Sequence, residues 1–172
     1  MKIQIEKTTY TGQITAPPSK SAAHRRLICA ALANGKSIIH GISESEDMKA
    51  TVDCIKALGA SVEKDGDTVT VIGCDPKNRE KATLNCRESG STLRFFVPIC
   101  LLSDKEATLN GSERLMSRPL EPYEEICVAQ GMDYVLTEKD LTVKGPITSG
   151  HFRLRGDVSS QFISGLMFAL PL

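Results

Sequence analysis

The sequence lacks an excess of charge of either sign. Its 172 residues include 21 Lys plus Arg and 21 Asp plus Glu, so the formal net charge is zero. This balance excludes a global field that would attract nucleic acid or an anionic membrane, and any anion site must be local. No apolar run approaches the roughly 18 residues of a membrane-spanning helix. The segment Met1–Glu6 alternates like a strand and lacks the apolar core of a signal peptide.

Signatures of metal binding and disulfides are missing too. The six cysteines share no CxxC spacing, and His24, His40 and His151 show no spacing typical of metal ligands. We therefore expect no metal, no cofactor and no disulfide framework. Mostly buried, reduced thiols are expected instead, as in a cytoplasmic protein.

What the sequence does contain is an internal repeat. Three segments carry it: 13–21, 83–91 and 153–161. Their serines Ser19, Ser89 and Ser159 are separated by 70 residues each. Each segment predicts a strand, a short loop and a helix that begins at serine, a preferred N-cap residue.

A second pattern follows the first two copies. Residues 47–58 have helical periodicity and end at Gly59, and a turn at 64–67 leads into an alternating strand. The pattern recurs 72 residues later, with a helix from about Leu120 to Gly131 and a second hairpin. The repeat therefore predicts an α/β (α+β) fold of β-α-β-α-β-β units.

These units give an expected organisation of the chain. Unit one spans about 12–74, unit two about 82–146, and unit three begins at about 150–172. The third helix is apolar, and a lone repeat cannot bury such a face without its neighbours. We therefore expect the chain to be a fragment whose third unit continues beyond Leu172.

Basic residues accompany the three helix starts. Lys20, Arg25, Arg94 and Arg118 lie near them in sequence. Helix N-termini carry partial positive charge and free N–H groups, so their convergence would suit phosphate or carboxylate. Each feature alone also has a structural explanation, because serines cap helices and arginines solvate helix faces. The repeat predicts a site for a phosphate-bearing small molecule, without specifying a reaction.

The sequences of these loops resemble those of one family, the 5-enolpyruvylshikimate-3-phosphate synthases. Residues 18–25 are similar to its PSKSxxxR segment, 88–95 to its xxGTxxR segment, 118–120 to its RP segment and 156–162 to its GDxSSQF segment. These motifs occur in family order over the whole chain. The resemblance implies two similar lobes of three units each, of which this chain would cover most of the N-terminal lobe.

The resemblance also implies roles for individual residues. Lys20 would act in catalysis and help to hold phosphoenolpyruvate, while Ser21 and Arg25 would hold the carboxylate side of shikimate 3-phosphate. The other implied ligand-binding residues are Ser159 and Ser160 at the 3-phosphate, Gln161 at both ligands, and Gly90 and Arg118 at the phosphate of phosphoenolpyruvate, with Arg94 supporting them. Glyphosate would compete for the phosphoenolpyruvate position.

The implied reaction is enolpyruvyl transfer in the shikimate pathway to chorismate and aromatic amino acids. The family takes its acid–base groups from the second lobe, so this chain alone is expected to bind without turnover. The complete enzyme is expected to be a monomer. Glu88 departs from the Asn of many members, and an acid there should repel ligand unless it pairs with an arginine.

Three alternatives stay open. UDP-N-acetylglucosamine enolpyruvyl transferase shares the fold, but Lys20 is followed by serine rather than asparagine, and Cys127 falls in a predicted helix instead of a loop. An RNA 3′-phosphate cyclase would need a basic face, which the neutral charge disfavours. A non-catalytic half-site that binds a phosphorylated ligand would also fit a truncated chain.

Overall fold

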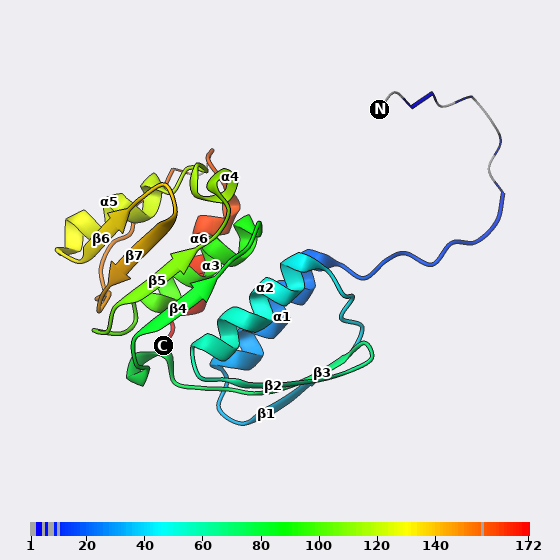
Figure 1. Ribbon diagram of the computed structural model, residues 1–172, viewed down its shortest axis with the longest axis horizontal. Helices are drawn as coiled ribbons and strands as arrows, with labels where there is room; N and C mark the ends of the chain where they lie inside the picture. The colour runs from blue at the N-terminus through cyan, green and yellow to red at the C-terminus, as the bar shows by residue number, and fades with distance from the viewer. Residues whose placement is uncertain (1–2, 5, 7–8, 10, 156) are drawn as a thin grey trace.

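The computed structural model places two β-sheets side by side, with helices packed on each (Figure 1). It describes residues 3–4, 6, 9, 11–155 and 157–172. The first part of the chain contains α1 (Lys20–Leu32), β1 (Lys36–Ile39), α2 (Glu46–Ala57), β2 (Ser61–Asp65), β3 (Thr68–Ile72) and the short helix η1 (Pro76–Asn78). The second part contains β4 (Ala82–Asn85), α3 (Gly90–Cys100), β5 (Ala107–Asn110), α4 (Glu113–Met116), α5 (Glu121–Gln130), β6 (Asp133–Leu136), β7 (Asp140–Lys144) and α6 (Ser160–Ala169).

The first sheet is antiparallel, with strand order β1-β3-β2. Its central strand alternates, so that Val69 and Val71 are buried on the face that α1 covers. The turn between β2 and β3 places Gly66 at φ 59°, in the left-handed region that glycine adopts without a steric penalty. The predicted hairpin at 64–67 is thereby confirmed.

The second sheet has the order β4-β5-β7-β6, in which β4 and β5 are parallel and the other pairs are antiparallel. The α5 helix ends where Gly131 takes up φ 67° and its N–H bonds back to the last turn, as the sequence predicted. Between residues 82 and 146 the elements follow the order β-α-β-α-β-β, with the short α4 added.

Two predicted strands do not form in the described chain. Residues 13–15 and 153–155 belong to no sheet, and Ile14 is 96% exposed. A strand is stabilised by a partner: in the second unit β4 finds β5, whereas residues 11–19 run away from both sheets (Figure 1). The alternating segment Met1–Glu6 falls partly outside the described residues, as does Gly156 of the third motif.

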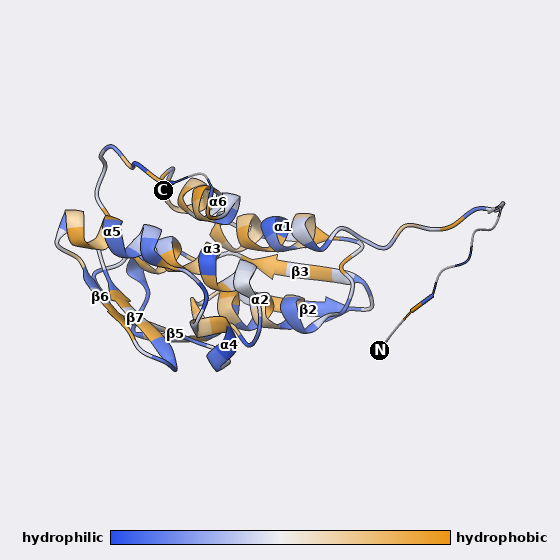
Figure 2. Cartoon of the chain, turned by 90° about the horizontal axis from the view of Figure 1, so that it is seen from above, coloured by the Kyte–Doolittle hydropathy of each residue, from blue (hydrophilic) through white to orange (hydrophobic). Residues whose placement is uncertain are grey.

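The α3 helix forms the centre of the core. Nine of its eleven residues are buried, and Phe95, Phe96 and Ile99 are each no more than 1% exposed. A helix of this composition must be covered on every side, and α2, α6, β5 and β7 cover it. Hydrophobic colouring dominates both α3 and α6, which pack against each other (Figure 2).

The thiols are mostly buried, as expected. All six cysteines are free; Cys54, Cys86, Cys100 and Cys127 are buried, but Cys29 is exposed. Within the described residues, no helix is both long enough and apolar enough to cross a bilayer.

Arg79 lies in the linker between the two sheets and is bonded to the second part of the chain. Its side chain is 6% exposed and donates four hydrogen bonds of 2.8–3.0 Å to backbone carbonyls, those of Glu80, Cys100, Lys105 and Glu106. A guanidinium satisfies this spread of acceptors because it presents donors along two edges of a plane. It thereby fixes the end of α3 against the start of β4 and β5.

We predict that Arg79→Lys lowers the free energy of unfolding by about 2–3 kcal/mol, because one ammonium group cannot satisfy the buried carbonyls. Urea denaturation measures the loss. Lys81→Ala is the control: it removes an exposed ion pair with Glu106 (2.8 Å) and should cost less than about 1 kcal/mol. Equal losses in the two variants would contradict the role given to Arg79.

Candidate functional site

Each of the three repeated serines caps the helix that follows it. The hydroxyls of Ser19, Ser89 and Ser159 cap α1, α3 and α6 by accepting a backbone N–H bond of 3.2–3.3 Å. The donors are Ala22, Thr92 and Gln161. The predicted N-caps are confirmed, and each cap leaves further backbone N–H groups of the first turn without helical partners.

The first turns of α3 and α6 are bonded to each other through Gln161. Its amide nitrogen donates to Ser91 Oγ (2.7 Å), and its amide oxygen accepts from Arg94 (3.0 Å). The Arg94 guanidinium also stacks over the Phe162 ring at 5.1 Å. Gln161 is therefore held in one orientation by α3 before any ligand binds.

Arg118 reaches the same place from the loop between α4 and α5. Its guanidinium lies against the Cα of Gly90, where any side chain would overlap it. Burial, followed by the charge of Arg118, lowers the pKa of Arg94. Neither arginine has a carboxylate within ion-pair distance in the described residues. Two such cations with no counter-ion favour the binding of an anion.

The α1 helix contributes Lys20, Ser21 and Arg25. The Arg25 guanidinium donates to the Ser21 carbonyl (3.0 Å) and to Ser164 Oγ on α6 (3.3 Å). It also lies 5.2 Å from the centre of the Phe95 ring on α3. Arg25 therefore touches all three helices rather than solvating a surface, whereas Ser21 is exposed.

Lys20 pairs with Asp47 in the first turn of α2, at 2.5 Å. Sequence reasoning missed Asp47, because an acid in a first helical turn is explained by the helix dipole alone. The pair is partly exposed, so it orients the ammonium group more than it stabilises the fold.

The loop before α3 is also held by α2. Arg87 has φ 52°, unusual for a residue other than glycine, and its guanidinium bonds to Glu46 (2.6 Å) and Asp53 (2.8 Å). These bonds secure a backbone conformation that would otherwise be disfavoured. Glu88 follows in the same loop and is exposed, and it makes no ion pair within the described part of the chain.

The structure leaves one predicted pair less defined. Ser160 is exposed at the start of α6, and Ser159 is half-buried with its hydroxyl used in capping. The preceding Arg155 is bonded to Asp157 (2.7 Å) instead of pointing free. Both serines stand beside Gln161, at the open end of the helix.

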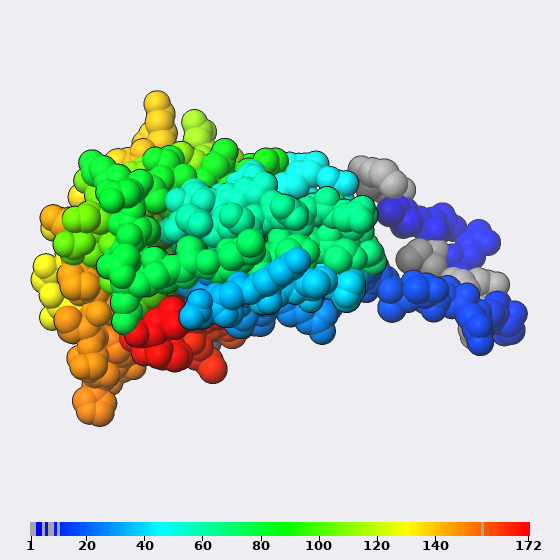
Figure 3. Space-filling view, turned by 90° about the horizontal axis from the view of Figure 1, so that it is seen from below, coloured from blue at the N-terminus to red at the C-terminus, as the bar shows by residue number. Residues whose placement is uncertain are grey.

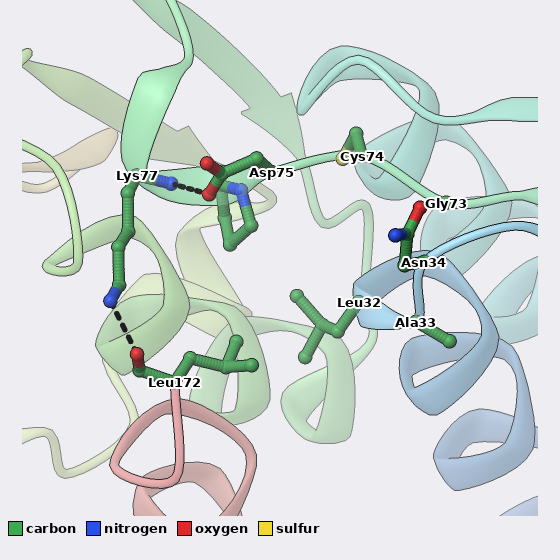
Figure 4. Close-up of a pocket in the computed structure, with 9 residues that line it drawn as sticks. Leu32, Ala33, Asn34, Gly73, Cys74, Asp75, Lys77 and Leu172 are labelled. Atoms are coloured by element: carbon green, nitrogen blue, oxygen red, sulfur yellow. Dashed lines mark hydrogen bonds between the residues drawn. The ribbon is translucent and has the colours of Figure 1, made fainter.

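A distinct pocket of about 450 Å³ lies at the opposite ends of α1 and α6. It is lined by residues that include Leu32, Cys74 and Leu172, and Lys77 donates to the Leu172 carbonyl (Figure 4). The C-terminal residues reach the surface there, beside the segment that follows α1 (Figure 3). None of the predicted site residues lines this pocket.

The site is thus a set of donors and cations at three helix starts. Hydroxyls, an amide, an ammonium group and guanidiniums can hold anionic oxygens, but the nearby carboxylate Asp47 is paired with Lys20. In the described chain, no three His, Cys, Asp or Glu residues gather closely enough to hold a metal ion. The arrangement can bind and orient anionic groups, and among the described residues Glu88 is a carboxylate beside it that makes no ion pair.

Comparison with known proteins gives one consistent answer. A family model described as EPSP synthase (3-phosphoshikimate 1-carboxyvinyltransferase) matches residues 5–172. The 3-phosphoshikimate 1-carboxyvinyltransferase of Clostridium kluyveri is 43% identical over 173 residues, covering 99% of this chain and 40% of the relative. That of Clostridium novyi is 44% identical over 180 residues, covering 98% and 41%.

The fold has a counterpart among solved structures. EPSP synthase from Acinetobacter baumannii superposes with a TM-score of 0.79 at 24% identity, over 92% of this chain and 37% of that one. The chain spans about 40% of the length of the curated relatives it matches.

The contact of α6 with α3 depends on Gly165. A Cβ there would overlap the Tyr123 hydroxyl and lie 2.7 Å from the Arg94 carbonyl oxygen. That hydroxyl itself donates to the Arg94 carbonyl (2.6 Å). We predict that Gly165→Ala lowers the free energy of unfolding by about 1–3 kcal/mol, because neither the buried ring nor the backbone can give way.

Denaturant unfolding provides the measurement. Gly150→Ala is the matched control, since its Cβ would meet only Gln130 Nε2 at an ordinary 3.8 Å. The control should stay within about 0.5 kcal/mol of the parent. An unchanged stability in Gly165→Ala would show that α6 can move away from α3 at no cost.

Proposed function

The chain belongs to the EPSP synthase family, and on that premise we propose that the protein of which it forms part transfers the enolpyruvyl group of phosphoenolpyruvate to the 5-hydroxyl of shikimate 3-phosphate. Phosphate is the second product, and the reaction serves the shikimate pathway to chorismate and aromatic amino acids. The observation that carries the proposal is the convergence of Gln161, Arg94 and Arg118 at the starts of α3 and α6.

In this proposal the two anionic substrates lie across the three helix starts. Lys20, Gly90 and Arg118 hold phosphoenolpyruvate, with Arg94 behind them. Shikimate 3-phosphate takes the remaining groups: Ser21, Arg25, Ser159, Ser160 and Gln161. The geometry supports this division because Gln161 lies between α3 and α6, where it can contact both ligands.

Holding the substrates together supplies much of the catalysis. Both carry phosphate and carboxylate groups that repel one another, and fixed cations and helix N-termini offset the repulsion. Orientation also removes the entropy of encounter, worth about 7–11 kcal/mol in well-aligned systems. In this proposal the Lys20 ammonium, which pairs with Asp47, stabilises charge on phosphoenolpyruvate as the hydroxyl attacks.

The chemical steps need more than this chain provides. The 5-hydroxyl loses a proton as its oxygen bonds to C2 of phosphoenolpyruvate, and C3 gains one. The tetrahedral intermediate then loses a proton from C3 and phosphate from C2 in one elimination. We place the groups that move these protons outside residues 1–172. The isolated chain is accordingly a binding half-site in this proposal.

The proposal extends to the cellular location, the oligomeric state and the inhibition of the complete enzyme. We take the complete enzyme to be a cytoplasmic monomer that glyphosate inhibits by occupying the phosphoenolpyruvate position. A UDP-N-acetylglucosamine transferase that uses a loop cysteine is disfavoured, because Cys127 is fully buried within α5.

Phosphate release tests the reaction. With both substrates present, the complete protein should release phosphate and form the enolpyruvyl ether, whereas residues 1–172 alone should stay at the blank rate. Lys20→Met should lower kcat/KM of the complete protein about 100-fold, as removal of a charge-stabilising donor does elsewhere. Lys49→Met is the control, because Lys49 pairs with Glu46 on the exposed face of α2. A complete protein inactive with this substrate pair would refute the function.

Gly90→Ala tests the placement of the ligands. The new methyl group displaces the Arg118 guanidinium, the mobile end of a flexible side chain, so stability should change little. Affinity for glyphosate should fall about 10-fold or more, and affinity for shikimate 3-phosphate less than about 2-fold. Titration calorimetry on the complete enzyme measures both. Equal losses for the two ligands would contradict the placement.

A further inference from the structure

Four polar side chains form a continuous hydrogen-bonded chain through the core. His24 Nδ1 lies 2.7 Å from Thr51 Oγ1, which lies 2.9 Å from Thr92 Oγ1. The Thr92 hydroxyl then donates to Ser89 Oγ at 2.7 Å. This hydrogen-bonded network runs from α1 through α2 to the N-cap of α3.

These groups are removed from water. The exposed fractions are 1% for His24, 0% for Thr51 and Thr92, and 3% for Ser89. Buried polar groups cost free energy that an apolar core would not, so a network of this kind serves specificity of structure better than stability.

The hydrogen bonds of this network are donated in one direction. Burial lowers the pKa of His24 to about 4, against the opposing effect of Asp47, so the imidazole is neutral near pH 7. Its Nε2 has no partner among the described residues. A buried acceptor without a partner is less costly than a buried N–H without one, which favours a proton on Nδ1. The donors then run in order from His24 to Thr51, Thr92 and Ser89.

The internal repeat shows that this support is particular to α3. The positions equivalent to Thr92 in α1 and α6 are Ala22 and Phe162, which have no hydroxyl. Ser19 and Ser159 accordingly cap their helices with a backbone N–H bond alone, in the described structure. A serine can therefore cap its helix without a buried hydrogen-bonded network behind it.

The position of His24 is also used in the other two helices. Its equivalents, 70 residues apart, are Arg94 and Ser164. Arg94 bonds to Gln161 on α6, and Ser164 accepts from Arg25 on α1. One position in each helix thus ties it to a neighbour, and the three ties close a ring around the helix starts. The His24 tie alone passes through α2.

We propose that His24 is a positioning residue that acts through Thr51 and Thr92 on the Ser89 cap, fixing the first turn of α3 relative to Lys20 and Arg25 on α1. Its consequence for substrates rests on the proposed function: loss of this network should weaken the binding of phosphoenolpyruvate, held at Gly90, more than that of shikimate 3-phosphate.

Thr51→Val in the complete protein removes the central hydroxyl at constant shape, and Thr51→Ser retains it. We expect Thr51→Val to raise KM for phosphoenolpyruvate about 10-fold or more, as small misplacements of binding groups do. KM for shikimate 3-phosphate should change less than about 2-fold, and Thr51→Ser should restore both values. His24→Leu should reproduce the loss, and His24→Asn, which keeps a polar atom near Nδ1, should repair it.

Amide hydrogen exchange gives a readout that needs no turnover. The Thr92 and Leu93 amides bond to the Ser89 side chain and carbonyl, so both should exchange faster in Thr51→Val, with Val143 in β7 unchanged. If Thr51→Val does not fold, Thr92→Ala replaces it, since α1 carries Ala22 at that position.

The outcomes separate the two proposals. An inactive parent protein refutes the proposed function, and exchange at Thr92 and Leu93 then decides the positioning role by itself. KM values that rise together, or exchange that accelerates throughout the chain, would reduce the network to a general contribution to stability. Unchanged KM values and unchanged exchange would overturn it as well.

Discussion

The burial of α3 is the constraint on which the rest of the structure depends. Nine of its eleven residues are buried, so it cannot stand at a surface, and it is covered by α2, α6 and the strands β5 and β7 of the second sheet. Its N-terminus is the end that stays accessible to polar groups, because Ser89 and Gly90 begin the helix beside Arg118 and Gln161. A packing requirement therefore determines where the charged groups meet.

Charge at the site follows from the same burial. Arg94 is partly desolvated between α3 and α6, close to Arg118, and its pKa is lowered for that reason. Arg87, by contrast, pairs with Glu46 and Asp53, and Arg155 pairs with Asp157. Cations without such partners at the end of a buried helix are suited to ligands that bring negative charge, although the chain as a whole is neutral.

The α2 helix shows how polar groups can add precision to such a site. From its buried face Thr51 connects α1 with α3, and from its exposed face Asp47 and Glu46 hold Lys20 and Arg87. Neither set is required to form the helix, whose caps and periodicity suffice. These side chains set the positions of α1 and of the loop before α3, the two segments between which α2 lies.

Local patterns in the sequence determined the helices that begin at Ser19, Ser89 and Ser159, their serine caps and the two hairpins, since each depends on residues within a few positions of one another. The tertiary structure alone decided the partners: Lys20 with Asp47, Gln161 with Arg94 and Ser91, which are 27, 67 and 70 positions apart. It also decided that residues 13–15, though patterned as a strand, would remain unpaired. The physical reason is the same in both cases. A side-chain contact or a strand ladder needs a partner brought there by the packing of other elements, and no local pattern contains that partner.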